Sequence, residues 1–147
     1  MPALAQASAT YLTDLAALAI GATADASRVA QGRGAAAARL HAIKADIRNG
    51  LADRHLSVAT VAAQHHIAPR TVHRLFERDG TTFSAYEVSI RLGRARRMLE
   101  DPRLAGRTIS AIAFECGFSD LSYFNRTFRR AFHLTPSDIR NAALRAW

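Results

Sequence analysis

Residues 118–128 read FSDLSYFNRTF and place hydrogen-bonding side chains among aromatic ones. The polar members recur at three- and four-residue intervals and would share one face of a helix: Ser122, Asn125, Arg126 and Arg129. The apolar members recur on the other side and predict a core-facing stripe. Arginine can bond guanine O6 and N7 together, which discriminates against a wrong base by roughly 1–3 kcal/mol. The polar face therefore suits base recognition, although it also suits an ordinary solvated surface.

A second part of the chain has the same organisation. SVATVAAQHHIAPRTVHRLF (57–76) and TISAIAFECGFSDLSYFNRTF (108–128) each indicate a helix, a tight turn and a second helix. Each has a small residue where two helices would cross and an apolar residue directly after the turn. This is the pattern of a helix-turn-helix unit, whose second helix lies in the major groove of DNA.

The two copies align residue by residue, with one difference in length. Ala62 matches Ala113 at a separation of 51 residues, whereas Arg74 matches Arg126 at 52. The second copy therefore has one more residue in its turn. The second helix of the first copy also has a polar stripe, formed by Arg70, His73, Arg74 and Glu77. Each copy thus offers an arginine on an exposed stripe.

The remaining segments predict an all-α fold, because no run alternates with period two for long enough to make a strand. The expected parts are an apolar helix plus linker over 1–38 and a DNA-binding domain over 39–147. Within the domain we expect a first helix-turn-helix unit at about 57–79, a central helix at about 83–100 and a second unit at about 108–132. A central helix of this length spans about 27 Å, near the ~34 Å between successive major grooves.

The charge is uneven along the chain and favours a polyanionic partner. The formal net charge is +8, while residues 1–38 have two arginines and two aspartates and so contribute nothing to it. Residues 39–147 hold the whole excess, as expected of a nucleic-acid-binding domain.

Other chemistry finds little support in the sequence. There is no glycine-rich phosphate loop, no plausible Ser–His–Asp set and no carboxylate pair set in an obvious pocket, so neither an enzyme nor a cofactor is predicted. His65 and His66 are adjacent and lack a third ligand in register, so a surface or turn role is favoured over a metal site. Cys116 is the one cysteine, and its position between two aromatic residues predicts a buried, inert thiol. Nothing indicates a signal peptide or a membrane span, and the chain is expected in the cytoplasm.

The segments GFSDLSYFNRTFRRAFHLTPSDIR (117–140) and 57–76 resemble the C-terminal DNA-binding domain of AraC/XylS transcription regulators. The resemblance covers about residues 39–147. It implies a homeodomain-like, seven-helix domain that binds promoter DNA, activates transcription and recruits RNA polymerase. The base contacts that it implies are Arg70, His73, Arg74, Leu121, Ser122, Asn125 and Arg126; Arg129 joins them through its place on the polar stripe.

Two positions depart from the pattern of that family. His65 stands where an apolar residue is usual, and His66 where the turn glycine is usual. A histidine in a left-handed turn is strained, so the first unit is expected to be the less rigid one. Leu121 offers no hydrogen bond and could only meet a thymine methyl group.

Residues 1–22 resemble the last helix of the sensor domain found in many members, which implies a homodimer through residues 7–22. The sequence leaves open whether the chain is a piece of a longer regulator. Two other functions also remain open on the same fold. One is a protein-interaction module whose basic face binds an acidic partner. The other is a nucleoid-type protein that binds DNA without sequence preference.

Overall fold

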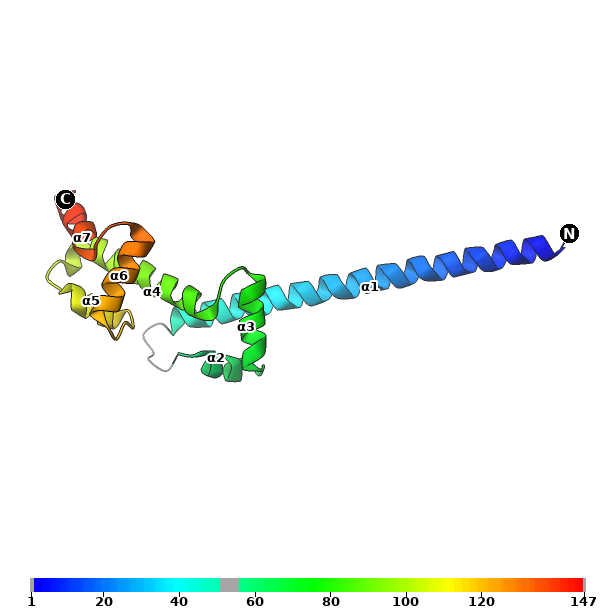
Figure 1. Ribbon diagram of the computed structural model, residues 1–147, viewed down its shortest axis with the longest axis horizontal. Helices are drawn as coiled ribbons and strands as arrows, with labels where there is room; N and C mark the ends of the chain where they lie inside the picture. Colours follow the sequence, from blue (N-terminus) through cyan, green and yellow to red (C-terminus); the bar gives the residue numbers. More distant parts are fainter. Residues whose placement is uncertain (1, 51–55, 147) are drawn as a thin grey trace. The chain divides into compact units, whose positions relative to one another are not determined.

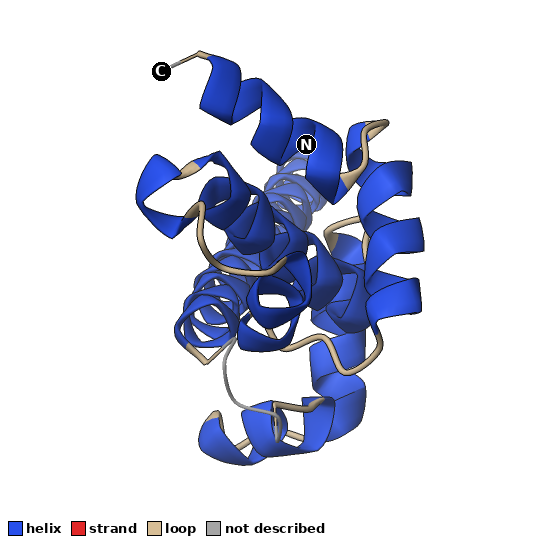
Figure 2. Ribbon diagram, turned by 90° about the vertical axis from the view of Figure 1, so that its left-hand side faces the viewer, coloured by secondary structure: helices blue, strands red, loops and turns tan. Residues whose placement is uncertain are grey.

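The computed structural model describes residues 2–50 and 56–146, with side chains from residue 13 onward. Helices and loops make up these residues, and no strand occurs among them (Figure 2). Contacts within the chain divide the molecule into two compact parts, residues 1–39 and 40–147. The helices are α1 (Pro2–Asn49), α2 (Val58–Gln64), α3 (Pro69–Arg78), α4 (Phe83–Glu100), the short 3-10 helix η1 (Pro102–Leu104), α5 (Ile109–Glu115), α6 (Leu121–Phe132) and α7 (Pro136–Arg145).

Helix α1 corrects one expectation, because it runs without a break through the glycine-containing segment 21–38 that suggested a linker. Eight of the eighteen residues in this segment are alanine, the strongest helix former, and none is proline. Each of its three glycines costs about 1 kcal/mol relative to alanine, which cooperative propagation from the flanking turns can offset. An ion pair between Asp25 and Arg28, one turn apart, adds local support.

The first helix-turn-helix unit consists of α2 and α3, and its core includes the last turns of α1. Several side chains there are buried: Ile43, Ile47, Val61, Ala62, Val72, Leu75 and Phe76. Phe76 of α3 also packs on the beginning of α4, with its ring centroid 5.7 Å from that of Phe83 and 5.6 Å from that of Tyr86. The first unit is thereby joined to the central helix through aromatic contacts.

The second helix-turn-helix unit, α5 and α6, packs with α7 against the C-terminal half of α4. The buried side chains come from all four helices: Leu92, Ala95, Leu99, Ile112, Ala113, Cys116, Phe118, Phe124, Phe128 and Ile139. Four phenylalanines form a chain of ring contacts through this core, with successive centroids 4.7–5.4 Å apart. Figure 1 shows α4 running from the first unit, α2 and α3, to the second, α5 and α6.

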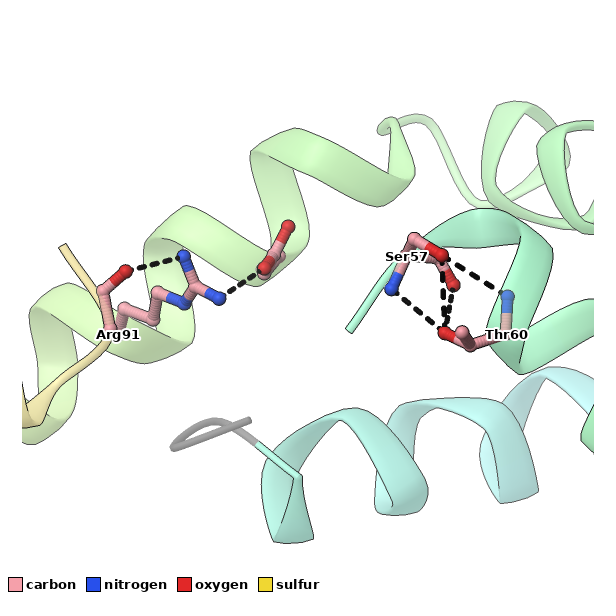
Figure 3. Close-up of polar contacts among 5 residues, drawn as sticks. Ser57, Thr60 and Arg91 are labelled. Carbon is pink, nitrogen blue, oxygen red and sulfur yellow. Dashed lines mark hydrogen bonds and ion pairs between the residues drawn. The ribbon is translucent and has the colours of Figure 1, made fainter. Parts of the chain in front are cut away.

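Most of the helices begin at a residue whose side chain caps the first turn. Ser57 and Thr60 form a capping box at the start of α2, in which each side chain bonds the other residue's backbone N–H (Figure 3). Thr135 and Asp138 do the same at α7, with Pro136 in the first helical position. Ser57 and Thr135 are therefore the N-caps of α2 and α7.

Candidate nucleic-acid interface

Helix α3 separates its apolar and polar residues onto opposite sides. Val72, Leu75 and Phe76 are buried, and Pro69 occupies the first helical position, where its missing N–H costs nothing. The polar stripe on the other side is fully exposed: Arg70, His73, Arg74 and Glu77. The predicted two-faced helix is confirmed, and the three candidate DNA-contacting residues of this unit lie together on one surface.

Helix α6 has the same design, with Phe124 and Phe128 fully buried. Its exposed stripe is the predicted one: Ser122, Asn125, Arg126 and Arg129. The Asp120 carboxylate caps the helix by accepting a hydrogen bond from the Tyr123 N–H at 2.5 Å. Leu121 is half-buried and packs on the hydrophobic core, so only part of its side chain remains for contact with DNA.

The arginines of the two stripes have exposed side chains. Within residues 13–50 and 56–146, no ion pair engages Arg70, Arg74 or Arg126. The side chain of each is exposed on the polar side of its helix. That is the arrangement required to reach phosphates or base edges in a groove.

The turns of the two units have the same hydrogen bonds, which confirms the internal repeat. Ile67 N–H donates to Ala62 C=O at 3.0 Å, and Phe118 N–H donates to Ala113 C=O at 3.1 Å. These bonds span five residues and require a left-handed residue just before the donor. His66 with φ 52° and Gly117 with φ 90° fill that place. Four residues then separate α2 from α3, and five separate α5 from α6, as the alignment predicts.

Each turn is tied to the helix that precedes its unit, but by different chemistry. In the first unit, His65 Nε2 lies 2.7 Å from Asp46 Oδ2 on α1. In the second, Arg91 Nη1 of α4 donates to the Gly117 carbonyl at 2.9 Å (Figure 3). Sequence reasoning missed the role of Arg91, because its partner lies 26 residues further along the chain and no local pattern reveals the pairing.

Two of the other three arginines of α4 have partners within the protein. Arg96 Nε donates to Glu100 Oε1 at 2.8 Å, and its guanidinium carbon lies 5.1 Å from the centroid of the Phe132 ring. Arg94 Nη2 lies 3.7 Å from Glu115 Oε1. The other carboxylate oxygen of Glu115 pairs with Arg107, which precedes α5 in the chain. Glu115 is a second residue whose role sequence reasoning missed.

The other candidate residues for chemistry, His65 and Cys116, have structural roles. His65 is engaged with Asp46, and no group of three or more potential metal ligands occurs among the described residues. Cys116 is buried, with its Sγ 3.7 Å from Met98 Sδ, and burial raises the pKa of its thiol to about 11. The expected burial of this thiol is confirmed, and its low reactivity stays a prediction. None of the helices in the described part of the chain is both long and apolar enough to span a membrane.

Comparison with protein families finds a match to the family described as "Helix-turn-helix domain" over residues 61–142. The matched segment begins in α2 and ends in α7, so it contains both candidate recognition helices.

Comparison with curated proteins finds transcriptional activators. The activator RhrA of Rhizobium meliloti is 42% identical over 108 residues, which cover 74% of this chain and 34% of RhrA. The activator RhaS of Escherichia coli is 37% identical over 105 residues, covering 71% of this chain and 36% of RhaS. The chain thus spans about a third of the length of these relatives.

Two solved structures share the fold at somewhat lower identity. A Chromobacterium violaceum transcriptional regulator, described as AraC-type DNA-binding domain-containing, superposes with a TM-score of 0.67 at 28% identity, covering 75% of this chain and 96% of that one. A probable AraC family regulator from Rhodopseudomonas palustris gives a TM-score of 0.64 at 26% identity, with 71% and 96% covered.

Proposed function

This chain belongs to the AraC/XylS family of transcription regulators, and we propose that it binds double-stranded promoter DNA with sequence specificity through α3 and α6. The observation that carries the proposal is the pair of matching polar stripes on the second helices of two helix-turn-helix units. Neither stripe contributes to the hydrophobic core, and among residues 13–50 and 56–146 no ion pair engages the arginines of either stripe. We assign base contacts to Arg70, His73, Arg74, Ser122, Asn125, Arg126 and Arg129, and a lesser apolar contact to Leu121.

The length of α4 supports recognition of DNA by both α3 and α6 of one chain. Helix α4 has 18 residues and connects the two units, so it spans about 27 Å at 1.5 Å per residue. That length approaches the ~34 Å between successive major grooves on one side of DNA. One chain would then bind two half-sites, as a dimer of simpler regulators does.

We further propose that the protein activates transcription by recruiting RNA polymerase to a promoter. The relatives RhrA and RhaS are named as activators, which supports this choice over repression. Promoter binding of this kind takes place in the bacterial cytoplasm and needs no catalytic chemistry. We therefore propose a cytoplasmic DNA-binding protein and not an enzyme.

A homodimer through residues 7–22 is also part of the proposal. The described side chains of this segment include three large apolar ones that are strongly exposed: Leu15 at 55%, Leu18 at 74% and Ile20 at 69%. Apolar residues exposed in this way on a helix favour pairing with a second helix. A measurement of mass in solution, with Leu18→Glu as the disrupting variant, would test the pairing.

Selection from a random duplex library at near-physiological salt tests the central proposal. We expect a motif with two short blocks about one helical turn apart. Arg74→Ala should relax the first block and Arg126→Ala the second. Arg145→Ala, which removes an exposed charge from α7, serves as the charge-matched control and should leave both blocks intact.

Recovery of DNA without any motif would refute specific reading. Affinity that depends on salt but not on sequence would then favour the nucleoid-type protein. Weak binding to all DNA would favour the protein-interaction module.

A further inference from the structure

The contacts of Arg91 point to a role that goes beyond helix packing. We propose that Arg91 is a positioning residue, which holds the second recognition helix in place on the central helix and so determines the half-site spacing that the protein accepts. The inference rests on the proposed reading of DNA by α3 and α6, and it names the residue that relates one helix to the other.

Arg91 makes its contacts in a nearly enclosed space between α4 and the second unit. Its Nη1 donates to the Gly117 carbonyl at 2.9 Å, and its Nη2 lies 2.6 Å from Glu87 Oε1, one turn earlier on α4. The side chains of Arg91 and Glu87 are only 15% and 14% exposed. Figure 3 shows the guanidinium lying between these two oxygen partners. The head group is therefore oriented from both sides.

The carbonyl that Arg91 holds belongs to the residue on which the direction of α6 depends. Gly117 has φ 90°, and the next residue, Phe118, is buried in the core and followed closely by the cap Asp120 of α6. A rotation of the Gly117 peptide would change the direction in which the chain enters α6. Because α4 is one continuous helix, fixing this peptide to α4 fixes the recognition stripe relative to α4.

The energetics of the site favour orientation over stability as the role of Arg91. Nε of Arg91 is buried and has no hydrogen-bond partner among the described residues. A buried ion pair generally contributes little net stability, because desolvating the two charges costs about as much as their attraction gains. A buried donor without a partner lowers that contribution further. The two contacts instead restrict the orientation of the guanidinium, because a planar group can bond two acceptors at once in only a few orientations.

Among the described residues, the turn of the first unit has no hydrogen bond to α4; the polar contact of α4 on this side is the Tyr86 hydroxyl, which accepts from Arg48 Nη1 of α1 at 3.0 Å. The turn is tied to α1 through Asp46 and His65, and α3 meets α4 through the Phe76 contacts with Phe83 and Tyr86. Phenylalanine contacts tolerate small shifts better than a hydrogen-bonded turn does. Besides the ion pair of Arg94 with Glu115 on α5, the hydrogen bond from Arg91 to the Gly117 carbonyl ties α4 to the turn itself, and it therefore offers a specific control over the relation of α6 to α3.

The experiment measures binding of the intact chain to its selected operator and to three altered duplexes. One duplex has a base pair inserted between the half-sites, one has a base pair deleted there, and one has the bases of the second half-site changed. We expect Arg91→Ala to reduce the preference for the correct spacing, and for the correct second half-site, by about tenfold. Discrimination at the first half-site should stay as in the wild type.

Two further variants separate positioning from mere folding. Arg97→Ala removes an exposed arginine from the same helix and should keep the wild-type preferences. Arg91→Lys retains the charge and a donor and should restore part of the spacing preference, which also keeps the test valid if Arg91→Ala does not fold.

The outcomes are distinguishable from a failure of the proposed function. A wild-type protein without any motif would overturn specific reading itself. A wild-type motif together with unchanged preferences in Arg91→Ala and Arg91→Lys would overturn the role of Arg91 alone. A loss of affinity by the same factor on all four duplexes would also overturn it, because a purely structural residue has that effect.

Discussion

Replacing His66 by glycine should stabilise the protein, although it removes a side chain. His66 has φ 52° in the turn of the first unit, where the second unit has Gly117 at φ 90°. A left-handed conformation costs a residue with a Cβ about 1–2 kcal/mol. Glycine avoids that cost but loses roughly 0.5–1 kcal/mol more backbone entropy on folding. Because the His66 side chain is exposed, no packing is lost. The difference between these two ranges is about 0–1.5 kcal/mol, so we expect a net gain near its middle, about 0.75 kcal/mol.

The assay is thermal unfolding followed by circular dichroism, supported by urea titration at 25 °C. A gain of this size should raise Tm by about 2–6 °C for a domain of this length. Gly80→Ala is the reciprocal variant. Gly80 has φ 78° at the end of α3, and a Cβ added there would meet nothing within 4 Å. This variant introduces strain without a clash and should lower Tm. An unchanged or lower Tm for His66→Gly, with Gly80→Ala tolerated, would refute the strain argument.

Three other predictions concern single side chains. Alkylation of Cys116 at pH 8 should be far slower than that of a free thiol and should follow unfolding, because burial raises the pKa of the thiol to about 11; mass spectrometry across a urea series would measure it. Arg126→Ala should cost roughly 1–3 kcal/mol on the selected operator and relax one base position, which a binding titration against single-base variants would show. The pKa of Asp138 is lowered by hydrogen bonds from Thr135, so its stabilising effect is present above the ordinary value of 3.8 and disappears as the pH falls through the lower folded value. Asp138→Asn should therefore lose less stability than the wild type on acidification below about pH 4 in denaturant titrations.

Local sequence patterns were enough to predict most of the fold and most of the side chains of the candidate DNA-binding surface. The caps at Ser57 and Thr135, the continuous helix 83–100 and the opposite stripes of α6 depend on residues within one or two turns of each other. Interactions of this range can be read from spacing alone, because a helix brings residues three and four apart onto one face. The repeat added the turn geometry, since equivalent sequences form equivalent hydrogen bonds around His66 and Gly117.

The linker expected within 1–38 shows that local sequence patterns can also predict an interruption that does not occur. Glycines at 21, 32 and 34 suggest an interruption, yet α1 continues through all three. Helix formation is cooperative, so the balance is set over the whole segment and not at each glycine. The eight alanines of 21–38 outweigh the local penalties.

Apart from the segment 21–38, the sequence by itself determined which residues form helices, which faces are apolar and which side chains are presented outward on α3 and α6. Only the tertiary structure decided how those helices are held. It pairs Arg91 with the Gly117 carbonyl, Glu115 with Arg94 and Arg107, and Lys44 with Asp79. It also turns part of Leu121 into the core. The partners in these pairs lie outside the reach of helical periodicity. Their meeting depends on how separate helices pack, which no local pattern encodes.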